Sequence, residues 1–156
     1  MPPDFEAFAA LQRHGVPFVI VGGHAVNRHG FARATEDSDA VWLRSSESEG
    51  RLLAALTELG AEYISSTIDP ATGIERCYPV SLPFIQGHHL MMLFTKAGFL
   101  DLFDFIPGAP TENVDQLFMT SVEFGGFRFA SLDWLRRMKS ASGRSKDLTD
   151  LENLVE

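Results

Sequence analysis

Two aspartates separated by one residue follow a pair of glycines in this chain, and together they could bind a metal ion beside a phosphate group. Gly22-Gly23 ends an apolar run, and Asp37 and Asp39 come later in the chain. Side chains two positions apart on a strand point to the same face, so both carboxylates would face one divalent cation. Paired glycines let backbone N–H groups approach an anion where the next helix begins. The pattern therefore predicts metal and phosphate at one place.

The residue types favour Mg²⁺ or Mn²⁺ over zinc. Magnesium prefers carboxylates, water and substrate phosphates as ligands. His24 and His29 are five positions apart, so they would not share a helical face as a zinc pair does, and His88 and His89 would point oppositely on a strand. A zinc hydrolase is therefore disfavoured. A dinucleotide-binding fingerprint needs a third spaced glycine, which Gly22-Gly23 lacks, and no Gly-x-x-x-x-Gly-Lys motif occurs.

The order of these motifs resembles the nucleotidyltransferase superfamily related to DNA polymerase beta, most closely its small bacterial minimal and toxin-type (AbiEii-like) branches. That family has an apolar strand, Gly-Gly or Gly-Ser, paired aspartates on the next strand and a third carboxylate on a later one. Gly22-Gly23, Asp37 and Asp39 match the first parts, and Leu100-Asp101-Leu102-Phe103 matches the last. Further matches are His14-Gly15-Val16, Ala25-Val26, His29-Gly30, Arg33-x-Thr35-x-Asp37, Lys139, Gly143-Arg144-Ser145-Lys146-Asp147 and Asp150.

The resemblance implies a Mg-dependent enzyme that transfers a nucleotide from an NTP to a hydroxyl of an RNA, protein or small-molecule acceptor. It implies that Asp37 and Asp39 bridge two Mg²⁺ (or Mn²⁺) ions, as in other two-metal sites. Asp101 would complete the catalytic ion and help to remove the proton of the acceptor. The residues that the resemblance assigns to nucleotide binding are Gly22, Gly23, Arg33 and Lys139. It also implies a toxin-antitoxin-type module with an antitoxin or other partner protein.

These assignments have alternatives. Asp-x-Asp alone is often a solvated strand edge, and Arg33 could instead form a salt bridge with Glu36 or Asp37. Lys139 could be a charge on a helix surface, as could Arg144 and Lys146. The same fold could also act as a nucleotide-binding module without turnover, or as an interaction partner whose acidic face contacts a basic protein.

Composition narrows the class of protein. With 156 residues, 45% of them apolar and 13 of them Phe, one domain over 1-156 with one core is expected. A net charge of −8 argues against a broad nucleic-acid surface, which relies on Lys and Arg to neutralise phosphates. A single cysteine, Cys77, excludes an intrachain disulfide. Without a leader-like or long apolar segment, we expect a cytoplasmic protein with no membrane partner.

The motifs lie on both helices and strands, and the resemblance implies the nucleotidyltransferase fold, an α/β (α+β) fold with a mixed β-sheet flanked by helices and C-terminal helices. A helix capped by Asp4 should end at Gly15, and a strand should cover Phe18 to Val21. Ser46 and Glu49 predict a capping box for a helix that runs to about Leu59. Ser131 and Ser145 predict the caps of two helices in a C-terminal helical segment of about 131-156.

The third carboxylate is expected on a hairpin. Leu90 to Phe94 and Phe99 to Ile106 predict two strands joined around Lys96-Ala97-Gly98. On the second strand Asp101 and Asp104 would point to opposite faces, and the family pattern selects Asp101. Glu62 to Gly87 is interrupted by Pro and Gly, which predicts loops with one or two brief strands. Phe124 to Phe129 predicts another short strand pair.

Overall fold

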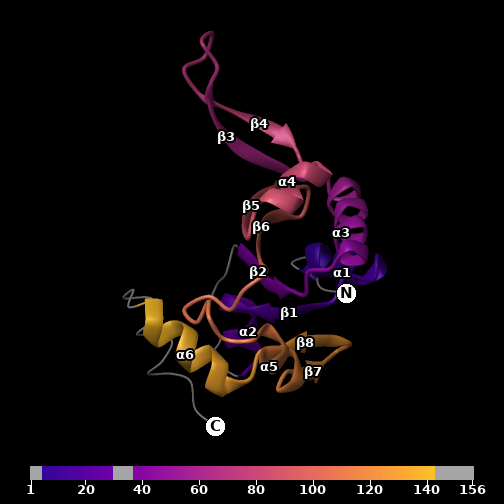
Figure 1. Cartoon of the computed structure of the whole chain (residues 1–156), viewed down its shortest axis with the longest axis vertical. Coiled ribbons are helices and arrows are strands. Elements are labelled where there is room, and N and C mark those ends of the chain that lie inside the picture. Colours follow the sequence, from indigo (N-terminus) through magenta and orange to yellow (C-terminus); the bar gives the residue numbers. More distant parts are fainter. Residues whose placement is uncertain (1–4, 30–36, 143–156) are drawn as a thin grey trace.

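The computed structural model describes residues 5–29 and 37–142, which form a single sheet with helices around it (Figure 1). In chain order the elements are α1 (Glu6–Arg13), β1 (Phe18–Val21), α2 (Gly22–Arg28), β2 (Asp37–Trp42), α3 (Ser46–Glu58), β3 (Glu62–Ile68), β4 (Glu75–Pro79), α4 (Leu82–Gly87), β5 (Leu90–Thr95), β6 (Gly98–Phe103), α5 (Val114–Met119), β7 (Val122–Phe124), β8 (Phe127–Phe129) and α6 (Leu132–Ser142). The strand order is β4-β3-β5-β6-β2-β1-β8-β7. The predicted mixed sheet flanked by helices is confirmed.

The centre of the sheet combines both strand directions. β1 pairs antiparallel with β2, whereas β2 pairs parallel with β6 and β1 pairs parallel with β8. All four residues of β1 are buried, as expected for a strand at the middle of the sheet. The next helix follows this strand directly, so the glycine pair lies at the junction between β1 and α2.

The cap of α3 lies one residue earlier than the sequence predicts. Ser45 Oγ accepts a hydrogen bond from the Ser48 N–H at 3.0 Å, and the Ser45 N–H donates to Ser48 Oγ at 2.7 Å. The predicted box of Ser46 and Glu49 is therefore wrong. Ser45 has the extended backbone that an N-cap needs, while Glu49 pairs with Arg44 instead.

The predicted β5–β6 hairpin is confirmed, but its second strand ends at Phe103 rather than Ile106. The chain leaves the sheet at Asp104, whose side chain lies 2.7 Å from the guanidinium of Arg44. The strand pair around Phe124 to Phe129 is also confirmed, as β7 and β8. Its turn is Gly125-Gly126, with φ of 57° and 87°, the left-handed conformation that tight hairpin turns require.

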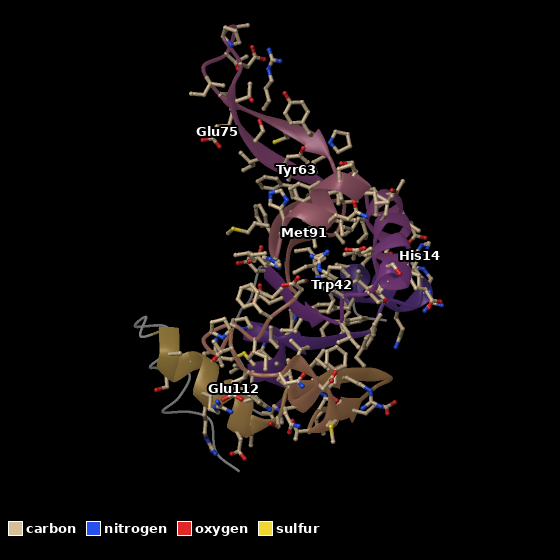
Figure 2. The ribbon with its side chains drawn as sticks, in the orientation of Figure 1. His14, Trp42, Tyr63, Glu75, Met91 and Glu112 are labelled. Atoms are coloured by element: carbon tan, nitrogen blue, oxygen red, sulfur yellow. The ribbon has the colours of Figure 1, made fainter. Side chains whose placement is uncertain are left out.

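The stretch from Glu62 to Gly87 is more regular than predicted. β3 and β4 form a long hairpin that projects from the rest of the molecule (Figure 1). The helix α4, which the sequence analysis missed, has its Pro in the first turn, where the missing N–H is tolerated. Tyr63 of β3 stacks on Phe84 of α4 with ring centroids 3.9 Å apart, and Figure 2 shows Tyr63 at the base of the hairpin. The helix α5 was also missed.

The hydrophobic core covers one face of β5 and β6. Alternate residues of these strands, such as Leu93 and Leu100, are buried in the same cluster as Leu52 of α3 and Ile85 of α4. At the C-terminal end, the N–H of Trp134 donates to Ser131 Oγ at 3.3 Å, which confirms the predicted cap of α6. The helix predicted from Ser145 lies outside the described residues. Of the helices that the structure describes, none has the length and apolarity needed to cross a membrane.

Candidate active site

Strand register brings the three predicted aspartates to one face of the sheet. Asp39 of β2 lies directly opposite Asp101 of β6 in the parallel pairing, and Asp37 lies two residues before Asp39. Paired residues on neighbouring strands share a face, and so do residues two apart on one strand. All three carboxylates therefore lie on the same face of the two central strands.

The carboxylates interact electrostatically. Burial, followed by the charges of Asp101 and Asp37, raises the pKa of Asp39 to about 7. The pKa of Asp101 is also raised, first by burial and then by the charge of Asp37. Asp39 and Asp101 also hydrogen-bond to each other, which raises the pKa of Asp39 further and acts to lower that of Asp101. Converging negative charge of this kind is what a bound cation would stabilise.

Lys139 of α6 reaches the same place. Its exposed fraction is 7%, and its positive charge acts on Asp39 in the direction that lowers the pKa of that carboxyl. Lysine is almost never this buried unless it is paired. The structure therefore does not make Lys139 a charge on a solvated helix surface. It places the ammonium group near the aspartates, on a helix far from them in the chain.

Gly22 packs directly against the carboxylate of Asp39. Its φ is +69°, and a Cβ atom built on it would lie 2.2 Å from Asp39 Oδ2. Only glycine combines this backbone conformation with so close an approach. Gly23 follows as a buried residue inside α2. The glycine turn and the aspartates are therefore adjacent, although they come from different elements.

Several predicted residues lie outside the part of the chain that the structure describes. These are Arg33 of the predicted nucleotide site, its alternative partner Glu36, and the family-like positions Gly30, Thr35, Gly143-Arg144-Ser145-Lys146-Asp147 and Asp150.

The donor set fits magnesium, which needs few protein ligands. Among residues 5–29 and 37–142, no three His, Cys, Asp or Glu side chains form a ready-made metal site. Magnesium, however, is commonly bound through one or two carboxylates, with water and substrate phosphates as its other ligands. The hydrogen-bonded Asp39 and Asp101, with Asp37 on the same face, supply oxygen donors of that kind.

Asp104, on the other side of the same strand end, has a structural partner. The Arg44 guanidinium donates from Nε to Asp104 Oδ2 and from Nη1 to Glu49 Oε2, both at 2.7 Å. His89 Nδ1 also lies 2.8 Å from Asp104 Oδ2. This arginine was not singled out from the sequence. It ties the end of β6 to the segment between β2 and α3.

Asp104→Asn should therefore weaken the fold and leave the candidate site intact. We expect the free energy of unfolding to fall by about 2 kcal/mol, less than for a fully buried pair because Arg44 keeps Glu49. The melting temperature should fall by about 4–8 °C. Thermal unfolding followed by circular dichroism measures the effect. An unchanged melting temperature would contradict the structural role.

The histidines have packing or hydrogen-bonding roles. His24 packs edge-on against Phe5 and Phe8, with ring centroids 5.1 Å and 5.6 Å away. His29 Nε2 lies 3.0 Å from the carbonyl oxygen of Ala130, and His88 Nδ1 lies 2.8 Å from that of Phe84. These three histidines therefore have partners within the fold.

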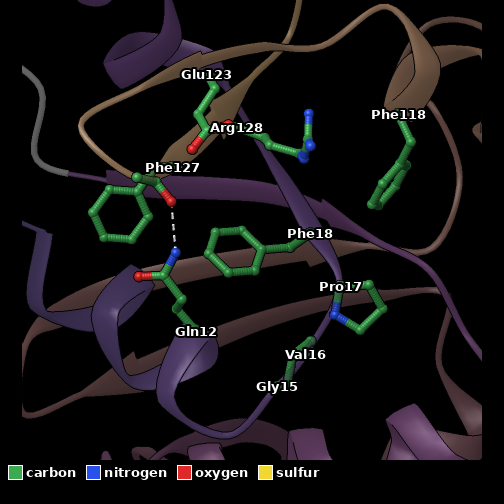
Figure 3. A pocket seen from close by; sticks show the side chains of 10 residues that line it. Gln12, Gly15, Val16, Pro17, Phe18, Phe118, Glu123, Phe127 and Arg128 are labelled. Carbon is green, nitrogen blue, oxygen red and sulfur yellow. Dashed lines mark hydrogen bonds between the residues drawn. The ribbon is translucent and has the colours of Figure 1, made fainter.

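A separate pocket of about 370 Å³ lies beside the β7–β8 hairpin (Figure 3). Gln12, Phe18, Phe118, Glu123 and Arg128 are among the residues that line it. Gln12 Nε2 donates a hydrogen bond of 2.6 Å to the carbonyl oxygen of Gly126 across one side. The three aspartates do not line this pocket, so the carboxylate face and the pocket are different features.

The metal-free protein should lose stability as pH rises from about 4 to about 7. The pKa of Asp39 is about 7 in the folded state against an ordinary 3.8, so between these values the folded state holds a proton that the unfolded state has released. The free energy of unfolding therefore falls as pH rises through this window, by on the order of 3 kcal/mol.

Thermal unfolding in EDTA at a series of pH values measures this dependence. Asp39→Asn, which cannot ionise, should flatten the profile between pH 4 and about 7. Added Mg²⁺ should raise the melting temperature at pH 8 more than at pH 5, because protons compete for the ligands at the lower pH. A parent profile that rises toward pH 7 would contradict the raised pKa of the buried Asp39.

Known structures share this architecture. The structure resembles that of the antibiotic-resistance factor ANT(2'')-Ia in solution, with a TM-score of 0.56 and 15% identity over 96% of this chain and 79% of that one. It also resembles a crystal structure of ANT(2'')-Ia in complex with adenylyl-2''-tobramycin, with a TM-score of 0.53 and 15% identity over 94% and 82% of the two chains. An antigenic nucleotidyltransferase-like protein from Paracoccidioides brasiliensis matches with a TM-score of 0.50 and 17% identity over 97% and 72%.

No family model and no curated protein sequence matches the chain. The similarity to these structures is therefore one of fold, with sequence identities of 15% to 17%.

Proposed function

We propose that this chain, which has the nucleotidyltransferase fold, transfers a nucleotide from an NTP to a hydroxyl group in a Mg²⁺-dependent reaction. The observation that carries the proposal is the shared face of Asp37, Asp39 and Asp101, with the Gly22 turn packed against it. A nucleotide transferase needs carboxylates for metal beside a backbone that phosphates can approach, and these residues would supply both.

The proposed reaction is an in-line substitution at the α-phosphorus of the NTP. The acceptor oxygen forms a bond to this phosphorus, the bond from phosphorus to the oxygen bridging to the β-phosphate breaks, and pyrophosphate leaves with the bonding electrons. The proton of the hydroxyl passes to Asp101. This carboxylate lies on β6, which is on the opposite side of β2 from β1 and the glycine turn. Bound Mg²⁺ would supply Lewis-acid stabilisation of the developing negative charge.

The other residues bind and orient. Asp37 and Asp39 would hold the metal, and Asp39 is fixed in place by contact with Gly22. The backbone around Gly22 and Gly23 would approach the triphosphate at the start of α2. Lys139 would contribute a buried positive charge next to the phosphates, and Arg33 is proposed for the same task from its position in the sequence.

The sequence supports two finer proposals, the first of them through the resemblance. The chain would be the toxin half of a two-gene module with an antitoxin partner, and it would act in the cytoplasm. Both extend the proposed activity and depend on it.

Label incorporation tests the proposed function. The protein is incubated with each of the four labelled NTPs and a cell extract, with Mg²⁺, with Mn²⁺ or with EDTA. We expect label in an acceptor with metal and none with EDTA. Asp39→Asn should abolish incorporation, whereas Asp115→Asn, an exposed carboxylate on α5, should leave it unchanged. No incorporation with any NTP and either metal would favour a nucleotide-binding module without turnover.

A further inference from the structure

An exposed apolar surface lies beside the aspartates on the same side of the sheet. We define the apolar face as Ile64 of β3, Leu90, Met92 and Phe94 of β5, and Phe99 of β6. Met92 is 65% exposed, and Ile64 and Phe99 are 47% and 46% exposed. Exposed large apolar side chains are ordinary when scattered, but a contiguous group often marks a binding site.

The register of the strands shows that this group is contiguous with the aspartates. Met92 lies opposite Asp101, which lies opposite Asp39. In the next row Phe94 lies opposite Phe99, which lies opposite Asp37, and the Phe94 and Phe99 rings are 4.9 Å apart. Neighbouring strands are about 4.8 Å apart. In each row of paired residues, an apolar side chain therefore lies one strand away from a carboxylate.

The apolar face lies on the side of the aspartates that the glycine turn does not occupy. Gly22 follows β1, and β1 and β6 flank β2 on opposite sides. If the triphosphate lies toward the glycine turn, the acceptor hydroxyl must approach the α-phosphorus from the opposite side. That direction leads over β6 and β5.

The charges of this surface select among acceptors. The strands β2, β3, β5 and β6 contain no Lys or Arg, and the charged residues of these strands that share the face are Asp37, Asp39, Asp101 and Glu62. Among the described residues, Lys139 of α6 adds one buried positive charge beside Asp39. A polyphosphate chain such as RNA needs cations for binding. A second copy of this chain would also bring a net charge of −8. The surface complements a partner that is apolar and basic.

We propose that the apolar face binds the acceptor, and that the acceptor is a polypeptide. Its apolar side chains would pack on Met92, Phe94 and Phe99, its Lys or Arg side chains would lie near Glu62 and the aspartates, and a Ser, Thr or Tyr hydroxyl would reach the site. This inference rests on the proposed function. The hydroxyl oxygen bonds to the α-phosphorus, pyrophosphate leaves, and the polypeptide retains a nucleotide phosphodiester.

Binding is tested without nucleotide, so that the result does not depend on turnover. Fluorescein-labelled short peptides carry a central Ser or Tyr between Leu and Phe, with Lys at both ends, and matched peptides replace Lys by Glu or the apolar residues by Gly. A single-stranded RNA of mixed sequence and labelled tobramycin represent the other acceptor classes. We expect fluorescence anisotropy to show binding of the apolar, Lys-containing peptides and a loss of binding in both matched series.

Two variants locate the binding surface. Met92→Gln and Phe99→Gln should each weaken peptide binding about fivefold or more, as expected when a contact at the centre of an interface is lost. Met119→Gln is the matched control, because Met119 is 76% exposed on α5 and should leave the affinity unchanged. Both changes on the apolar face replace exposed side chains, and circular dichroism checks that the fold is kept.

The outcomes separate this inference from the proposed function. Peptide binding that Met92→Gln weakens, without label transfer from any NTP, supports the surface and contradicts the enzyme. Label transfer to RNA or tobramycin that Met92→Gln leaves unchanged supports the enzyme and overturns the polypeptide acceptor. Failure of the apolar, Lys-containing peptides to bind, or equal binding of the Glu-containing series, also overturns it.

Discussion

Asp101→Asn should lower the rate of nucleotide transfer by a factor on the order of a hundred or more while most of the NTP affinity remains. Asp101 lies opposite Asp39 on the side of the site away from the glycine turn. In the proposed reaction it acts on the acceptor, whereas the triphosphate depends on Asp37, Asp39 and the turn. Loss of a transition-state interaction worth about 3 kcal/mol gives a change of this size.

The measurement compares label incorporation with NTP affinity by calorimetry in parent and variant. Asp104→Asn is the matched control, since it makes the same change on the same chain segment but removes a partner of Arg44. It should lower the melting temperature and leave transfer largely unchanged. If instead Asp104→Asn abolished transfer and Asp101→Asn did not, the roles given to the two carboxylates would have to be exchanged.

Gly22→Ala should disable the site even though it adds only one methyl group. The new Cβ would lie 2.2 Å from Asp39 Oδ2 and 3.0 Å from Asp39 Cβ, so the carboxylate or the turn must move. The left-handed backbone at φ of +69° adds a cost of about 1–2 kcal/mol for any L-residue. We expect the melting temperature to fall by at least about 4 °C and metal-dependent NTP binding to be lost.

Gly50→Ala provides the control for this experiment. Gly50 is exposed in α3, and a Cβ atom there would meet nothing within 4 Å. Alanine is favoured over glycine inside a helix by about 1 kcal/mol, so this variant should be slightly more stable than the parent. Thermal unfolding and calorimetry with Mg²⁺ and NTP measure both variants. Normal nucleotide binding by a folded Gly22→Ala protein would contradict the close packing of the turn against Asp39.

Local sequence rules predicted the parts of the site that depend on one strand or one turn. The two-residue period of a strand predicts that Asp37 and Asp39 share a face, and the structure confirms it. The same period predicts that Asp101 and Asp104 point to opposite faces of one strand, but β6 ends at Phe103, and Asp104 pairs with Arg44 beyond the strand end. The caps at Gly15 and Ser131 and the β5–β6 hairpin follow from equally local chemistry.

The remaining features depend on contacts between distant segments. Which residue of β6 faces Asp39 is decided by a parallel pairing across about sixty residues, and no local pattern fixes such a register. The burial of Lys139 depends on how α6 docks. The β3–β4 hairpin is longer and more regular than the one or two brief strands predicted there, because its Pro and Gly residues resemble loop signals although they occupy its tip and ends.

The buried Lys139 links the C-terminal helix to whatever occupies the carboxylate face. Its ammonium group and a divalent cation are attracted to the same aspartate, so we expect a cation that binds Asp39 to weaken the attraction between Asp39 and Lys139 of α6. By thermodynamic reciprocity, loosening α6 must strengthen cation binding by the same free energy. Occupancy of the site is thus coupled to the amide exchange rates of a helix that lies a hundred residues away in the chain.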